Sequence, residues 1–140
     1  MATFNKIDQF VEDLAHGVHD FTSDGTCTIT IFLTTNAETP VAGDSVLADL
    51  TEIAYTNLSS RVVAVASSGQ TSGTYSLVLT DHTLTASGAV ATFRMVGHYN
   101  DDPTSPADPL IQWYDHGSDV TLADSETYDI DYGASFFTLA

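Results

Sequence analysis

The feature that most constrains the fold is the segment 99–132, which joins a proline-rich acidic loop to an alternating strand pattern. The loop carries three prolines between residues 103 and 109. Proline fixes φ and removes a backbone donor, so neither a helix nor a central strand continues through this loop. Farther on, Tyr128, Ile130 and Tyr132 alternate with polar residues. That alternation is typical of a strand with one buried and one solvated face.

Similar strand patterns recur along the rest of the chain, separated by turns that contain Gly and Ser. The run 61–67 is short and apolar, which predicts a strand covered on both faces. We therefore predict a mainly β fold in one domain, an antiparallel, jelly-roll-like β-sandwich over about residues 25–140. The residues expected to face its core are Tyr75, Leu77, Leu79, Phe93, Met95, Tyr128 and Ile130.

An N-terminal amphipathic helix over about residues 3–17 is the other predicted element. Phe4, Ile7, Val11 and Leu14 recur at spacings of three and four, so they share one narrow helical face. This stripe either packs on the chain's own sheet or docks on a neighbouring molecule. We take its four residues as the candidate interface with a neighbouring subunit.

The charge balance restricts the partners of the chain. Three Lys and Arg residues stand against 19 Asp and Glu residues, a formal net charge of -16. Nucleic acids and anionic membrane surfaces are recognised by cationic side chains, so we expect neither as a partner. Copies of such a chain repel one another. Self-assembly therefore requires apolar contacts or bound cations.

The sequence contains no recognisable catalytic motif, and we predict no enzymatic activity, no cofactor and no catalytic residue. His16 and His19 have a spacing that can share a metal, but no other ligands accompany them, so an exposed polar pair is the simpler interpretation. Cys27 is the only cysteine, which excludes an intramolecular disulfide. Its alternating neighbours predict a buried thiol.

Two further segments leave alternatives open. The carboxylates of the Asn100–Asp108 loop could hold a divalent cation or form a solvated surface loop. Trp113 and Tyr114 could form an aromatic platform for sugar, or they could pack within the sheet.

Several stretches of the chain also resemble a recurrent small structural protein of tailed-bacteriophage particles. The stretches that carry the resemblance are Met1–Lys6, Val46–Ile53, Gln70–Leu79, Tyr99–Ser118 and Val120–Thr127. Their motifs are structural rather than catalytic, so the resemblance carries over no binding residues. It implies a virion component present in many copies.

The negative charge favours the outer capsid surface among the places such a component could occupy, because packaged DNA would repel the chain. The resemblance and the charge together predict a decoration (cement) protein that contacts the major capsid protein and copies of itself, as a trimer. The alternatives are a tail, neck or fibre component, and a carbohydrate-binding β-module on the virion.

Overall fold

The computed structural model describes residues 3–22 and 27–140 and confirms a mainly β fold with antiparallel sheets and one short helix. The elements in chain order are β1 (Asn5–Lys6), α1 (Gln9–Ala15), β2 (Ile29–Thr34), the 3-10 helix η1 (Leu47–Asp49), β3 (Val62–Val63), β4 (Val65–Thr71), β5 (Thr74–Leu79), β6 (His82–Thr85), β7 (Phe93–Asn100), β8 (Leu110–Val120), β9 (Thr127–Ile130) and β10 (Phe137–Leu139).

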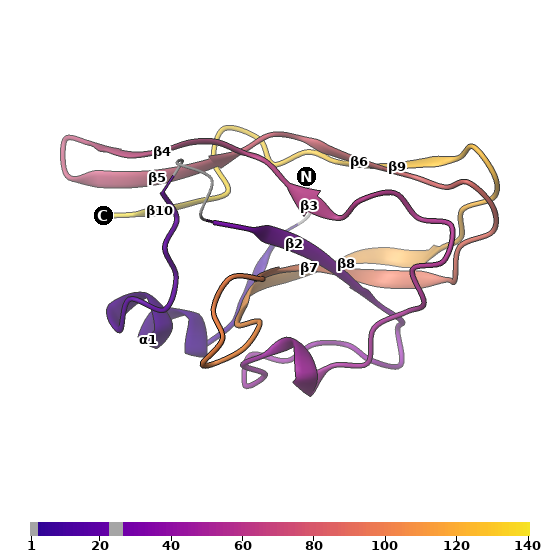
Figure 1. Ribbon diagram of the computed structural model, residues 1–140, viewed down its shortest axis with the longest axis horizontal. Coiled ribbons are helices and arrows are strands. Elements are labelled where there is room, and N and C mark those ends of the chain that lie inside the picture. The colour runs from indigo at the N-terminus through magenta and orange to yellow at the C-terminus, as the bar shows by residue number, and fades with distance from the viewer. Residues whose placement is uncertain (1–2, 23–26) are drawn as a thin grey trace.

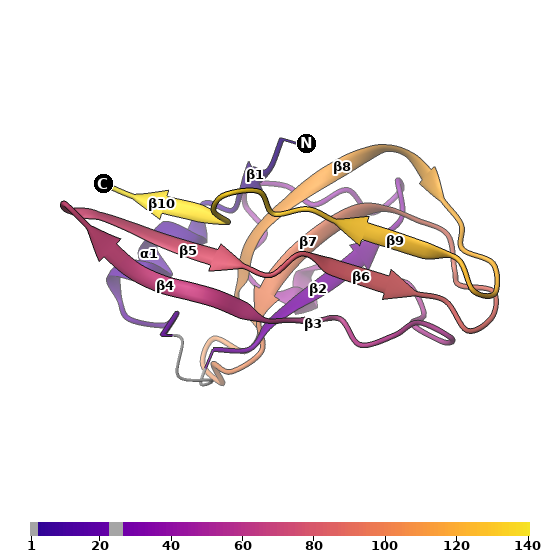
Figure 2. The ribbon, with the colours of Figure 1, turned by 90° about the horizontal axis from the view of Figure 1, so that it is seen from above.

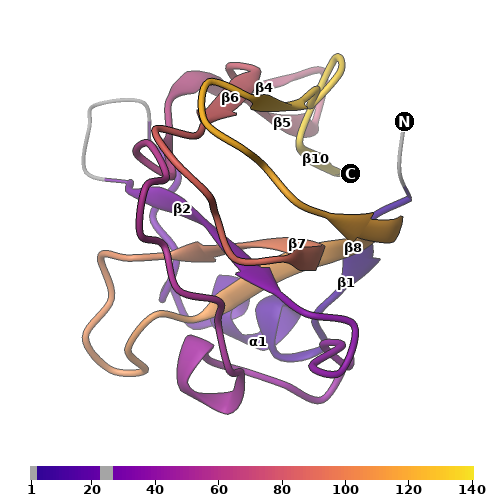
Figure 3. The same ribbon diagram turned by 90° about the vertical axis from the view of Figure 1, so that its right-hand side faces the viewer.

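The strands form two layers that face each other (Figure 1). One layer is a five-stranded sheet in the order β1-β8-β7-β2-β3. The other contains a three-stranded sheet, β10-β5-β4, and a two-stranded sheet, β6-β9. Only Thr80 and Asp81 separate β5 from β6, so the two small sheets follow one another along the same layer (Figure 2). Figure 3 shows this layer above the five-stranded sheet, with α1 below that sheet.

The core lies between the layers and contains most of the predicted residues. Leu77, Leu79, Phe93, Met95 and Ile130 are at most 3% exposed. The remaining two predicted core residues, Tyr75 and Tyr128, are partly buried and pack against the core. The period of two therefore identified the inward faces of β5 and β9 correctly, whereas in β7 every residue from Met95 to Asn100 is buried.

Close packing at the centre of the five-stranded sheet requires a glycine. All six residues of β2 are buried, and β2 pairs with β7 so that Phe32 lies opposite Gly97. A Cβ atom at position 97 would lie 2.1 Å from Cζ of the Phe32 ring. Because that ring is fully buried, it has no free space to move into.

The N-terminal helix is shorter than predicted. It spans Gln9–Ala15, whereas Asn5 and Lys6 form β1 and pair with Trp113 and Gln112 of β8. The prediction of helix from residue 3 was wrong because the first residues add a short strand to the sheet. The helix ends near the expected place, where Gly17 has φ +70° and its N–H donates to the carbonyl of Leu14.

The run 61–67 also differs from its prediction. It divides between β3 and the start of β4, and Val62 is 48% exposed. The expected coverage of both faces is wrong because only one face of this run is covered: Val63 is buried, whereas Val62 and Ala64 are exposed. β3 and β4 each lie at the end of their sheet. An apolar run without clear alternation cannot distinguish a central strand from an edge strand.

Candidate functional site

The four residues of the predicted interface do not share one exposed face. Ile7 is fully buried in the core of its own chain, so it has no surface to offer a partner. Phe4 and Leu14 are partly buried and pack against the core. Val11 is 53% exposed and is the one member that presents a large apolar surface to solvent.

An apolar groove lies beside Val11, between α1, β8 and β10, with a volume of about 280 Å³. We call it the α1–β10 groove, and its lining residues are Lys6, Phe10, Val11, Leu14, Ile111, Gln112, Phe137, Thr138 and Leu139. The rings of Phe10 and Phe137 meet edge to face with centroids 5.4 Å apart. Leu139 is 44% exposed. The accessible apolar surface therefore combines Val11 of the predicted stripe with Leu139 of β10.

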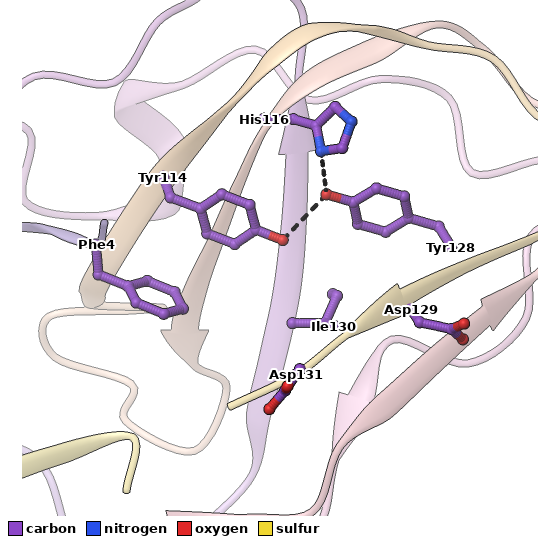
Figure 4. A pocket seen from close by; sticks show the side chains of 7 residues that line it. All are labelled: Phe4, Tyr114, His116, Tyr128, Asp129, Ile130 and Asp131. Atoms are coloured by element: carbon purple, nitrogen blue, oxygen red, sulfur yellow. Dashed lines mark hydrogen bonds between the residues drawn. The ribbon is translucent and has the colours of Figure 1, made fainter. Parts of the chain in front are cut away.

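A second pocket opens between β8 and β9 and has a volume of about 210 Å³ (Figure 4). We call it the tyrosine pocket, and its lining residues are Phe4, Tyr114, His116, Tyr128, Asp129, Ile130 and Asp131. The Tyr114 and Tyr128 hydroxyls are hydrogen-bonded at 3.1 Å. The Tyr128 hydroxyl also lies 3.0 Å from Nδ1 of His116. Figure 4 shows these three side chains converging from the two strands.

The chemistry of the tyrosine pocket suits binding by hydrogen bonds and ring contacts. Burial raises the pKa of Tyr114, and burial likewise raises the pKa of Tyr128. Both hydroxyls therefore stay protonated at neutral pH and can donate hydrogen bonds. The Phe4 ring meets the Tyr114 ring edge to face at 5.1 Å and supplies an apolar wall.

The acidic loop Asn100–Asp108 uses its polar groups largely for contacts within the chain. A carboxylate oxygen of Asp102 accepts the backbone N–H of Thr28. The Asn100 side chain accepts the backbone N–H of Asp102 and contacts Nδ1 of His19 at 3.4 Å. Within residues 3–22 and 27–140, no group of three or more His, Cys, Asp and Glu side chains is arranged to hold a metal ion. A divalent cation at this loop stays a prediction.

The two N-terminal histidines occupy different environments. His16 is exposed and lies 3.8 Å from Glu12. His19 is buried and stacks on Phe21 with ring centroids 5.1 Å apart. Burial lowers the pKa of His19 to about 4, partly offset by the negative charge of Asp13. The expectation of an exposed pair was therefore right for His16 and wrong for His19.

Trp113 and Tyr114 cannot form a joint aromatic platform, because neighbouring residues of a strand point to opposite faces. Tyr114 is buried against the tyrosine pocket, whereas Trp113 is partly buried against the core. Cys27 is also only partly buried, and burial raises the pKa of its thiol to about 12. That thiol is therefore a poor nucleophile at neutral pH.

The residues that sequence reasoning missed come together only through the packing of separate sheets and of α1 in the folded chain. His116 and Tyr128 belong to different sheets, and Phe137 and Leu139 meet α1 from the far end of the chain. The alternation of β9 does place Tyr128 on the inward face. No pattern in the sequence, however, indicates which residue of β8 would lie opposite it.

Comparison with known proteins gives no match for the chain among protein-family models, curated proteins or solved structures. Among the described residues, no helix is both long enough and apolar enough to cross a bilayer.

Proposed function

We propose that the chain is a bacteriophage virion structural protein that decorates the outer surface of the capsid. The observation that carries the proposal is the α1–β10 groove, an apolar surface on a strongly acidic chain. Apolar contacts do not require opposite charges, so the groove can hold the chain on a shell by non-covalent contacts. The resemblance to phage structural proteins supports the same role.

The net charge of -16 supports an outer position on the particle. Packaged DNA presents a dense array of phosphates that would repel this chain. The outer surface of the shell exposes the chain to solvent and counterions, which screen carboxylates. The major capsid protein is therefore the proposed partner, with Val11 and Leu139 at the contact.

Docking must leave the fold of the chain intact, and this restricts which variants can test it. Removing residues 1–17 would delete β1 together with the buried side chains of Ile7 and Phe10. Such a truncation would damage the core and therefore cannot isolate the interface. Substitutions at the exposed Val11 and Leu139 change the groove without opening the core.

Quantitative mass spectrometry and a density map of purified particles test the proposed location. We expect a copy number comparable with that of the major capsid protein, and density on the outside of the shell. A few copies confined to the tail, neck or fibres would contradict decoration and support that alternative. Absence from purified particles would contradict any role in the virion.

A carbohydrate-binding module on the virion is a second candidate, and the tyrosine pocket favours it. Aromatic side chains pack against sugar rings, while hydroxyls and carboxylates form hydrogen bonds with sugar hydroxyls. Phe4, Tyr128 and Asp131 supply these groups in one pocket. Calorimetric titration with host-surface glycans tests this function. Binding that is lost in Tyr128→Ala but retained in Trp113→Phe would support it, and no heat with any glycan would exclude it for those glycans.

A further inference from the structure

Strand β4 has an open edge. It pairs with β5, and within the described ranges 3–22 and 27–140 no strand pairs with its other side. Five of its seven residues are exposed. In an antiparallel pair, alternate residues direct their N–H and C=O groups away from the partner strand. The outer side of β4 therefore presents a row of backbone donors and acceptors to solvent.

The edge of β4 lacks the usual protection against pairing. Edge strands are commonly blocked by charged residues or by proline. Residues 62–80, which contain β4 and β5, include no charged residue and no proline. A register irregularity between Val65 and Ser67 affects only the beginning of the strand, and pairing with β5 is regular from Ser67 to Thr71. This leaves a regular, uncharged edge over the second part of β4.

Two other open edges of the molecule, those of β8 and β9, carry carboxylates. β8 contains Asp115 and Asp119, and β1 covers it only at Gln112 and Trp113. β9 pairs only with β6 and contains Asp129. Bringing two copies together at either edge would place like charges close to each other, which destabilises strand pairs. The edge of β4 avoids this repulsion.

We propose that β4 pairs antiparallel with β4 of a second copy of this chain and forms a two-fold symmetric dimer. In such a dimer each copy contributes its own β4 to the contact, and the two β10-β5-β4 sheets become one continuous sheet. The second copy is the occupant because the sheet has no charge to attract an oppositely charged partner. Two chains of net charge -16 can also approach at this uncharged edge without placing strand carboxylates opposite each other.

The side chains around the edge are small enough for this approach. Ser67, Gly69 and Thr71 are exposed on one face of β4, and a Cβ atom added at Gly69 would meet nothing within 4 Å. A neighbouring strand can therefore align its backbone without displacing bulky groups. This pairing does not depend on the proposed capsid role, because it needs only two copies of the chain.

Two double variants with the same added charge provide a matched test. Ser67→Asp with Thr71→Asp places two carboxylates on β4, and Ser118→Asp with Thr121→Asp places two at exposed positions in and just after β8. Sedimentation equilibrium in high salt measures the dimer dissociation constant of each. We expect the parent chain to dimerise and the β4 variant to dissociate about tenfold more readily, because like charges oppose strand pairing. The β8 variant should match the parent.

Hydrogen exchange gives a second readout that requires only the parent chain. Raising the protein concentration should slow exchange of alternate backbone amides in β4, while exposed amides of the β8–β9 connection should be unaffected. A chain that stays monomeric at every concentration would overturn the proposal. A dimer whose dissociation constant is unchanged in the β4 variant would also overturn it. The trimer expected from the resemblance would do the same if the β4 amides stay unprotected in that trimer.

Discussion

The two small sheets of the second layer are both antiparallel but differ in charge. The β10-β5-β4 sheet contains no charged side chain, whereas the β6-β9 sheet contains Asp129 and is followed by Asp131. Both sheets bury one face against the five-stranded sheet, with Leu77 and Leu84 fully buried in the respective halves. The comparison separates two requirements. Inward residues determine the fold, and outward residues determine what the surface can contact.

The largest expected effect tests whether the two halves form one core. Leu77→Ala on β5 and Leu84→Ala on β6 should each reduce the free energy of unfolding by about 2–5 kcal/mol, because each leaves a cavity in a fully buried site. Urea denaturation followed by circular dichroism measures both losses. We expect a single transition in each variant. Two separated transitions would show that the charged and uncharged halves fold independently.

The strand faces could be predicted from the sequence, but the pairing between strands could not. Alternation placed Leu77 and Ile130 correctly because a half-buried strand shows its inward face in its own residues. His98 is different. Phe93 and Met95 were expected to face inward, so alternation assigns His98 to the opposite, polar face of the strand, yet it is fully buried and its Nε2 lies 2.8 Å from the Tyr132 hydroxyl. A long-range contact of this kind leaves no periodic signal.

The same limit explains the N-terminal region. Phe4 and Ile7 fit a helical stripe, but the backbone between them pairs with Trp113 and Gln112. Local spacing cannot register a hydrogen-bond partner about a hundred residues away, so tertiary pairing overrode the helical pattern. The α1–β10 groove was likewise only half predicted, since Val11 belongs to the stripe but Leu139 enters from the other end of the chain.

Mild acid should weaken the fold through two buried histidines, His19 and His98. Burial lowers the pKa of His19 to about 4 and that of His98 to about 3, each from an ordinary value of 6.5. The unfolded chain therefore binds protons below about pH 6.5 while the folded chain does not, and stability falls as the pH falls. Each histidine contributes at most about 1.4 kcal/mol per pH unit in this range.

Urea denaturation at pH 7 and at pH 5 measures this loss before most carboxylates titrate. His19→Gln should reduce the pH dependence and leave the contribution of His98. A chain equally stable at both pH values would contradict the buried, neutral state of these histidines.

The groove variants test whether an apolar surface, rather than charge, holds the chain on its partner. Val11→Asp and Leu139→Asp should each weaken binding to capsid shells by about tenfold or more, because each loses the burial of an aliphatic side chain. Val41→Asp is the matched control, since Val41 is 58% exposed and lies outside the groove. Equal binding by all three variants in a shell co-sedimentation assay would place the contact elsewhere.

The smallest expected effect is the change in particle binding with salt and divalent cations. It tests whether repulsion between the carboxylates of neighbouring copies limits their packing. Repulsion between neighbouring copies reaches about 30 Å at 0.01 M salt and about 8 Å at physiological ionic strength. Divalent cations at carboxylate clusters would reduce it further. We therefore expect the bound fraction on particles to fall modestly when salt is removed and a chelator is added, and to recover when either is restored. Because apolar contacts hold the chain, high salt should leave it bound. Release only at high salt would instead indicate a basic docking surface on the shell, and an unchanged bound fraction would show that repulsion between copies does not limit their packing.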